Sequence, residues 1–169
     1  KYNSTKKDGG TIYNNQYSSI EIINSEFIKN TAKIHGGAIY NFGQIIIEET
    51  IFDYNKTQEQ DGGAINNQLN GDLKINTCKF RRNVAKKGGG AIINFGKIIL
   101  DGTLFSKNKT KEDNGGAVNN QMSGVLEALN VCFNHNLANV NGGAIYNMNE
   151  NNLNLKNCKF NDNKPDNVN

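Results

Sequence analysis

GGAIYN, at residues 36–41, decides the fold, because close variants of it return throughout the 169-residue chain. The other copies are GGTIYN at 9–14, GGAINN at 62–67, GGAIIN at 89–94, GGAVNN at 115–120 and GGAIYN at 142–147. Successive copies are 27, 26, 27, 26 and 27 residues apart. A regular period of this length indicates a repeat architecture in which each unit stacks on its neighbours.

A second motif, FxxN, lies between successive copies of the first and follows the last one. It spans residues 27–30, 52–55, 80–83, 105–108, 133–136 and 160–163.

A finer repeat is superimposed on both motifs. The sequence NNQ occurs at the end of the hexapeptide in coils 1, 3 and 5, whereas NFG occurs in coils 2 and 4. The duplicated unit is therefore a two-coil super-repeat of 53 residues.

Alternation of residue types within each copy indicates β-strands. The fourth residue of the hexapeptide is apolar in every coil, the fifth varies, and the sixth is always Asn. Because neighbouring strand residues face opposite sides, the fourth and sixth should point inward and the fifth outward. A leucine-rich repeat has a similar period, but neither LxxLxL nor helical periodicity is present. The sequence predicts an all-β protein, in which residues 1–169 form one right-handed parallel β-helix (a β-solenoid) of six coils, each 26–27 residues long.

The strand that ends at each Phe shows a break in its alternation. Apolar residues stand seven and five positions before Phe, whereas small residues stand two before it, which predicts a bulge or bend. Small residues five positions after Phe indicate a third, shorter side of each coil. Identical residues should stack about 4.8 Å apart, and the two Asn columns should form side-chain ladders.

With these motifs the sequence resembles the polymorphic outer-membrane proteins of chlamydiae, which are defined by repeated GGAI and FxxN tetrapeptides. It also resembles the adhesin-like surface proteins of methanogenic archaea. All six coils carry both motifs, and only Thr11 and Val118 depart from GGAI. The resemblance implies a parallel β-helix shown outside the cell, as a segment of a longer surface protein with roles in adhesion. Such motifs are structural, so no binding residue carries over.

Composition and charge narrow the range of partners. The chain has 18 Gly, 32 Asn and no Trp, which suits a fold that turns often and stacks polar side chains. Its net charge of +3 includes no basic block and argues against a nucleic-acid partner. No apolar run approaches the ~18 residues of a membrane span, and residues 1–10 lack a signal-peptide apolar region. We expect any signal and anchor to lie outside this segment.

The acidic residues give the strongest argument for an enzyme, and it is weak. Glu48 and Asp101 should lie two coils apart, on the order of 9.6 Å by strand spacing. That separation is near the ~6.5–9.5 Å of inverting glycosidases. However, the acids of this face alternate by coil with lysines, as on a solvated ion-pair surface. We expect no catalytic residue.

Neither the His nor the Cys residues form a pattern that suggests a site. His35 and His135 are isolated turn residues a hundred positions apart, and the Gly pairs lack the context of a phosphate-binding loop. Cys78 and Cys158 share an inward row but should be roughly 14 Å apart, and Cys132 should face outward. We expect free thiols, no metal site and no cofactor.

Three sets of residues are candidate contact sites. Four aliphatic residues of coils 2 and 4 should point outward where the odd coils are charged, namely Ile46, Ile51, Ile99 and Leu104. Tyrosines of the outward GGAI row could contact carbohydrate, namely Tyr13, Tyr40 and Tyr146. The glycosylation pattern N-x-S/T occurs at Asn3, Asn55 and Asn108, but the last two belong to a ladder. Only Asn3 is expected to be available for glycan.

The leading functional prediction is a structural and adhesive segment that acts as a rigid stalk and interaction surface. Its partners would be a cell-surface or cell-wall glycan or a protein receptor, with self-association through the solenoid faces or ends as a further expectation. A carbohydrate-binding module is the alternative, and a polysaccharide-degrading β-helix enzyme comes third. Function cannot be decided from the fold alone, because it depends on individual sites.

Overall fold

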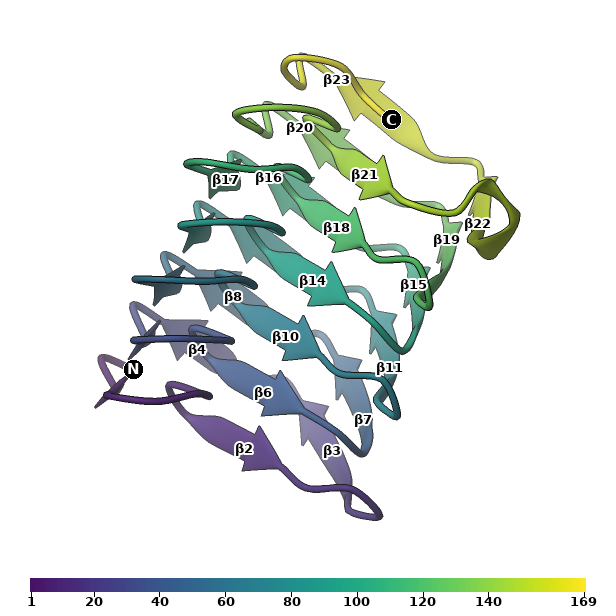
Figure 1. The fold of residues 1–169 in the computed structure, drawn as a ribbon. Helices are drawn as coiled ribbons and strands as arrows, with labels where there is room; N and C mark the ends of the chain where they lie inside the picture. Colours follow the sequence, from purple (N-terminus) through teal and green to yellow (C-terminus); the bar gives the residue numbers. More distant parts are fainter.

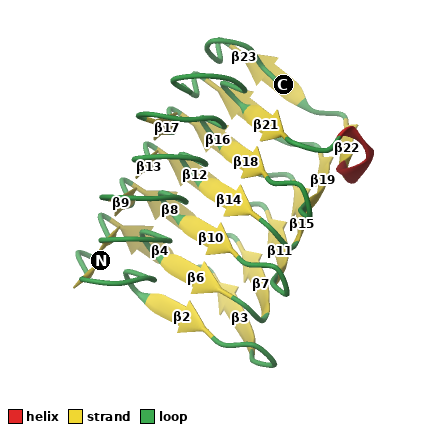
Figure 2. Ribbon diagram, in the orientation of Figure 1, coloured by secondary structure: helices red, strands yellow, loops and turns green.

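The coils contribute short strands to four parallel sheets, three of six strands and one of five, and they rise in a right-handed spiral from the N-terminus to the C-terminus (Figure 1). The computed structural model describes residues 1–169. Every strand pairs in parallel with its equivalents in adjacent coils. Figure 2 shows the strands forming continuous walls, with one 3₁₀ turn, η1 (Glu150–Asn152), near the C-terminal end. The predicted parallel β-helix is confirmed.

Two of the sheets carry the repeated motifs. The GGAI sheet consists of β2 (Ile12–Asn14), β6 (Ile39–Asn41), β10 (Ile65–Asn67), β14 (Ile92–Asn94), β18 (Val118–Asn120) and β21 (Ile145–Asn147). The Phe sheet consists of β4 (Glu26–Ile28), β8 (Ile51–Asp53), β12 (Lys79–Arg81), β16 (Leu104–Ser106), β20 (Cys132–Asn134) and β23 (Lys159–Asn161). In both sheets identical motif positions pair in register, so each motif residue forms a column.

The other two sheets complete the coil. The long sheet consists of β3 (Ser19–Ile23), β7 (Gln44–Glu48), β11 (Asp72–Asn76), β15 (Lys97–Asp101), β19 (Val125–Leu129) and β22 (Leu153–Lys156). The short sheet consists of β1 (Ser4–Thr5), β5 (Thr31–Ala32), β9 (Lys56–Thr57), β13 (Val84–Ala85) and β17 (Lys109–Thr110). The short sheet is the predicted third side, while the predicted second strand is divided between the long sheet and the Phe sheet.

A positive φ angle causes this division. One residue between the two strands has a left-handed backbone in every coil: Asn24, Glu49, Thr77, Gly102, Asn130 and Asn157, with φ between 45° and 55°. Such a residue turns the chain. Because it belongs to neither strand, it also shifts the alternation of inward and outward side chains by one position. The bend predicted from the break in alternation is therefore a sharp corner that separates two sheets.

The core is a set of apolar columns that run the length of the solenoid. The Phe rings stack with centroid distances of 4.6–5.1 Å, and Phe52, Phe80, Phe105 and Phe133 are fully buried. Twenty-six buried residues form a single cluster that includes the inward Ile and Leu rows. Burial of this apolar surface is the main stabilising contribution to the fold.

Both predicted Asn ladders are confirmed. In the GGAI ladder each amide Nδ2 donates to the Oδ1 of the next coil at 2.7–2.8 Å, from Asn14 through to Asn147. In the FxxN ladder the corresponding distances are 2.9–3.0 Å, from Asn30 to Asn163. These bonds satisfy amides that would otherwise be buried at a cost of a few kcal/mol each.

The Gly pair is required where coils approach closely. Gly36 has a φ of 60°, which Gly adopts at little cost. A Cβ on Gly37 would lie 2.1 Å from the carbonyl oxygen of Gly63 in the next coil. Only Gly at the second position allows adjacent coils to hydrogen-bond at this corner.

Candidate interaction surfaces

The predicted apolar residues lie on the outer surfaces of the long sheet and the Phe sheet. Ile46 in β7 is 37% exposed, and Ile99, Ile51 and Leu104 are half-buried. The register sets Lys74 between Ile46 and Ile99, and Lys79 between Ile51 and Leu104. We call these four aliphatic residues the apolar face. They form two pairs on adjacent sheets, and each pair has a lysine between its members.

The predicted tyrosines do not form one surface. Tyr13 and Tyr40 are neighbours, with ring centroids 5.4 Å apart, and both contact the ring of Phe42, at 5.8 and 4.9 Å. Tyr146 lies at the other end of the GGAI sheet, in β21. The structure therefore brings two of the three residues together, with Phe42 as an additional member.

The outward row between these tyrosines is covered. Asn66, Ile93 and Asn119 are at most 2% exposed, although their side chains point away from the core. In coils 3 and 5 a glutamine folds back over the row, since Gln68 Nε2 donates to Asn66 Oδ1 and Gln121 Nε2 donates to Asn119 Oδ1, both at 2.7 Å. The row thus points outward as predicted, but in the three middle coils it is covered and offers no open surface.

Polar contacts fix the Tyr13–Tyr40 end of the row. His35 stacks on Tyr40 with centroids 5.6 Å apart, and its Nδ1 lies 2.9 Å from Asp8 Oδ1. Burial raises the pKa of the Tyr40 hydroxyl to about 12, with a further contribution from the charge of Asp8. Tyr40 is therefore a partly buried packing residue, which leaves less of its ring available to a ligand.

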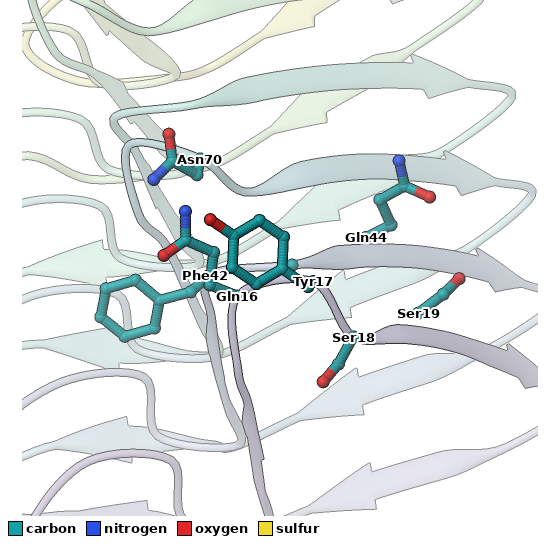
Figure 3. A pocket seen from close by; sticks show the side chains of 8 residues that line it. Gln16, Tyr17, Ser18, Ser19, Phe42, Gln44 and Asn70 are labelled. Carbon is teal, nitrogen blue, oxygen red and sulfur yellow. The ribbon is translucent and has the colours of Figure 1, made fainter.

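A hollow of about 460 Å³ lies at the nearby corner between the GGAI sheet and the long sheet. Figure 3 shows the side chains around it, with the Tyr17 ring among the amides of Gln16, Gln44 and Asn70. Phe42, Gly43, Ser18 and Ser19 complete the lining. Sequence reasoning missed this site, although the exchange of NNQ for NFG between coils signals a change at this corner.

The two acids considered for catalysis are held by amides. Asn76 Nδ2 donates to Glu48 Oε1 at 3.2 Å, and Asn130 Nδ2 donates to Asp101 Oδ1 at 3.0 Å. Asn76 also occupies the strand position between Glu48 and Asp101. This arrangement is typical of a hydrogen-bonded outer surface.

An ionic cluster that no sequence motif predicts lies on the Phe sheet. Asp53, 7% exposed, accepts hydrogen bonds from Arg81 and, in a two-pronged arrangement, from Arg82. The Arg82 guanidinium also lies 4.2 Å from the Tyr54 ring centroid. The hydrogen bond to Asp53 raises the pKa of Arg82. Since Asp53 of coil 2 binds both arginines of coil 3, the cluster acts as a clamp between these coils.

The remaining candidates are the cysteines, a possible metal site and the glycosylation position Asn3. Cys78 is buried, Cys132 and Cys158 are half-buried, and all three are free thiols. No group of three or more His, Cys, Asp or Glu side chains is arranged to hold a metal ion. Asn3 is exposed, and its backbone N–H donates to Asn30 Oδ1 at 3.1 Å, so it occupies the ladder position of the preceding turn. Its own amide contacts Thr11 instead of joining the ladder.

The fold and its paired motifs define a parallel β-helix of the GGAI/FxxN repeat type. The Chlamydia polymorphic membrane protein repeat family matches residues 24–41 and 130–148, and each match runs from an FxxN motif to the following hexapeptide. These matches confirm the resemblance to the chlamydial repeat proteins.

A curated relative points to the same kind of protein. The chain is 28% identical over 155 residues to the probable autotransporter YfaL of Escherichia coli strain K12. The aligned region covers 82% of this chain and 11% of that protein, so the chain spans about a tenth of its relative. No solved structure matches the chain.

Together the two matches indicate a cell-surface or extracellular protein of adhesin-like type. Neither match is to an enzyme. Within the chain itself, no helix has the length and apolar character needed to cross a membrane.

Proposed function

We propose that this chain is a structural and adhesive segment of a surface-displayed protein, in which it acts as a rigid stalk that carries interaction surfaces. The observation that supports this most strongly is the unbroken internal stacking. The two Asn ladders and the Phe column each run through all six coils. Bending the rod would strain hydrogen bonds in many coils at once, and each added coil extends it by contacts to its neighbours alone.

We propose the apolar face as the adhesive surface of this stalk. Ile46, Ile51, Ile99 and Leu104 are aliphatic, and the strands that carry them present no aromatic ring on this side. Without such a ring the face lacks a platform on which a sugar could stack. Aliphatic pairs that flank Lys74 and Lys79 suit a protein receptor with a mixed apolar and polar surface. The partner assigned to this face is therefore a protein.

The double variant Ile46→Lys/Ile99→Lys tests this assignment. It should reduce attachment of beads coated with the segment to receptor-bearing cells at least fivefold. The free energy of unfolding should fall by no more than about 1–2 kcal/mol, because the two new lysines would lie on either side of Lys74 but leave the inward columns intact. Glu21→Lys is the matched control, because it adds the same charge in the same outward row.

Three outcomes would contradict the assignment. Equal attachment of the double variant and the wild type would show that the face is ordinary surface. Loss of attachment in Glu21→Lys as well would indicate a general charge effect. A double variant that loses self-association in light scattering but keeps its attachment would make the face a contact between copies.

We also propose that the segment has no catalytic activity. Glu48 and Asp101 accept hydrogen bonds from neighbouring asparagines, and the matched relatives are surface proteins. Turnover of a panel of polysaccharides by the purified segment, lost in Asp101→Asn, would overturn this proposal.

A further inference from the structure

The two-coil super-repeat is expressed as a difference in loop length at the corner between the GGAI sheet and the long sheet. Coils 1, 3 and 5 connect the two sheets with four residues, at 15–18, 68–71 and 121–124. Coils 2 and 4 use only two, at 42–43 and 95–96. Each short turn therefore lies between two longer loops, which leaves space above it.

The space above the first short turn is the hollow of about 460 Å³ described above. Loop 15–18 and Asn70 of the next long loop flank it, and Phe42 belongs to the turn between them. Tyr17 is 96% exposed, so its ring is free to meet a ligand. A volume of this size is within the range of about 300–1,000 Å³ that small-molecule sites occupy.

The polar side chains of this hollow are open to a ligand. Gln16, Ser19, Gln44 and Asn70 are exposed, and the structure shows no hydrogen bond from their side chains to the rest of the protein. Amide and hydroxyl groups can both donate and accept hydrogen bonds. No charged residue lines the hollow. The chemistry thus favours an uncharged ligand rich in hydroxyl groups.

Tyr17 has an unusual backbone for its position. Its φ is 66°, a region that bulky residues seldom adopt. The register of the ladders aligns Tyr17 with Asn70 and Ser123, neither of which has a positive φ. Positive φ angles are common at the corners of this chain, Tyr2 and Tyr54 included, so at Tyr17 the angle indicates only that this loop follows a different path from the loops of coils 3 and 5.

The equivalent corner above the second short turn provides an internal comparison. There Asn70 replaces Tyr17 and Lys97 replaces Gln44, and Lys97 pairs with Glu127 at 3.7 Å. Ser123, at the position of Asn70, donates its hydroxyl to the Phe95 carbonyl at 2.8 Å. The second corner, built from loops of the same lengths, therefore has no tyrosine at the Tyr17 position, carries charges, and uses its hydroxyl internally. Only the first corner retains binding chemistry.

We propose that the hollow around Tyr17, the Tyr17 site, binds a neutral saccharide. The exposed Tyr17 ring offers an apolar face for the C–H side of a sugar ring, while the surrounding amides and hydroxyls match its hydroxyl groups. The Tyr17 site differs from the proposed Tyr13–Tyr40–Tyr146 contact and from the apolar face. It goes beyond the stalk function, so either proposal can fail without the other.

The test is saturation-transfer NMR and titration of the segment with cellobiose, maltose, lactose and N,N′-diacetylchitobiose. At least one should bind, and Tyr17→Asn and Gln44→Ala should each weaken that binding tenfold or more. Tyr17→Asn retains a residue that tolerates positive φ and that coil 3 carries at the same position, so the fold should persist. Met122→Ala, an exposed apolar residue outside the hollow, is the control and should bind normally.

Several results would overturn the proposal. The first is that none of the four disaccharides binds. The second is that both variants, with circular dichroism spectra like the wild type, keep full affinity. The third is that sulfated or sialylated versions of the same sugars bind at least as well as the neutral ones, which would point to attraction by charge. Attachment of beads to cells, measured in parallel, separates the two proposals: Ile46→Lys/Ile99→Lys leaves the residues of the Tyr17 site intact, and Tyr17→Asn leaves those of the apolar face intact.

Discussion

The inside and the outside of this solenoid follow different rules, although the same repeat builds both. Inside, the Phe stack and the two Asn ladders place the same residue in every coil, and the other inward columns hold apolar or small residues throughout. Outside, equivalent positions hold different residues: Glu21, Ile46 and Lys74 succeed one another in adjacent coils of one row. Inward positions are constrained because a side chain there must fit the copy above and the copy below at a spacing of about 4.8 Å.

The difference teaches where stability and recognition reside. A change in an inner column alters contacts with two neighbouring coils, so its effect should be large and independent of any ligand. A change on the outer surface leaves the columns intact, so its effect should be confined to binding. The following variants test this division, beginning with the largest expected loss of stability.

Phe80→Ala should have the largest effect. Phe80 is fully buried and stacks on Phe52 and Phe105 with centroid distances of 4.6 and 4.9 Å. Its truncation leaves a cavity in the middle of the column and should lower the free energy of unfolding in urea by about 3–5 kcal/mol. Lys79→Ala, one residue earlier on the outer side, is the control and should change it by less than about 0.5 kcal/mol. Similar losses in both variants would mean that the two faces are not distinct.

Asn83→Ala should rank second. Its amide donates to the Phe52 carbonyl and to Asn108, and its oxygen accepts from the backbone and side chain of Asn55. Removal leaves several buried polar groups unpaired, at about 1–3 kcal/mol each before relaxation, so we expect a net loss of about 2–4 kcal/mol in urea unfolding. The exposed Asn151→Ala serves as the comparison. An unchanged stability for Asn83→Ala would show that the ladder is dispensable.

Cys78 should give the protein a smaller, pH-dependent contribution. Burial raises the pKa of its thiol to about 11, above its value in the unfolded chain. The unfolded state therefore releases the thiol proton first, so this contribution is complete below about pH 8.5 and declines as the pH rises towards 11. In Cys78→Thr, which carries the residue found in this column at Thr50 and Thr103, stability should fall less between pH 8 and pH 10.5 than in the wild type. Cys132→Ser is the control. If the free energy of unfolding depends on pH identically in Cys78→Thr and in the wild type, the Cys78 thiol is in contact with water.

Glycosylation should have the smallest effect on stability, and it should directly distinguish an exposed Asn from an Asn buried in a ladder. Asn3 is exposed, whereas Asn55 and Asn108 are fully buried and bonded within the FxxN ladder. Expression in a host that glycosylates N-x-S/T should modify Asn3 alone, with little change in melting temperature. Peptide mass spectrometry measures the occupancy of each position. Sugar on Asn108 would contradict the burial of that ladder residue.

The sequence by itself determined the coil length, the strands and the inward columns. Its repeats allowed this because residues that recur every 26 or 27 positions must occupy equivalent places in a stacked coil. The break in alternation before each Phe also located the corner that divides the second strand, at residues such as Glu49 and Asn130. For the candidate sites, the sequence predicted that Ile46 and Ile99 lie on an outer surface, and the structure places them there.

Only the tertiary structure decided what the outer surface offers. The sequence shows that Asn66 and Asn119 point outward, but not that Gln68 and Gln121 fold over them. Nor does it show that Tyr17, Gln44 and Asn70, from three different coils, surround one hollow. Inward positions are fixed by a local rule of alternation, which a sequence displays. Loop paths at a corner depend instead on the lengths and side chains of the loops above and below, and these meet only when the coils stack.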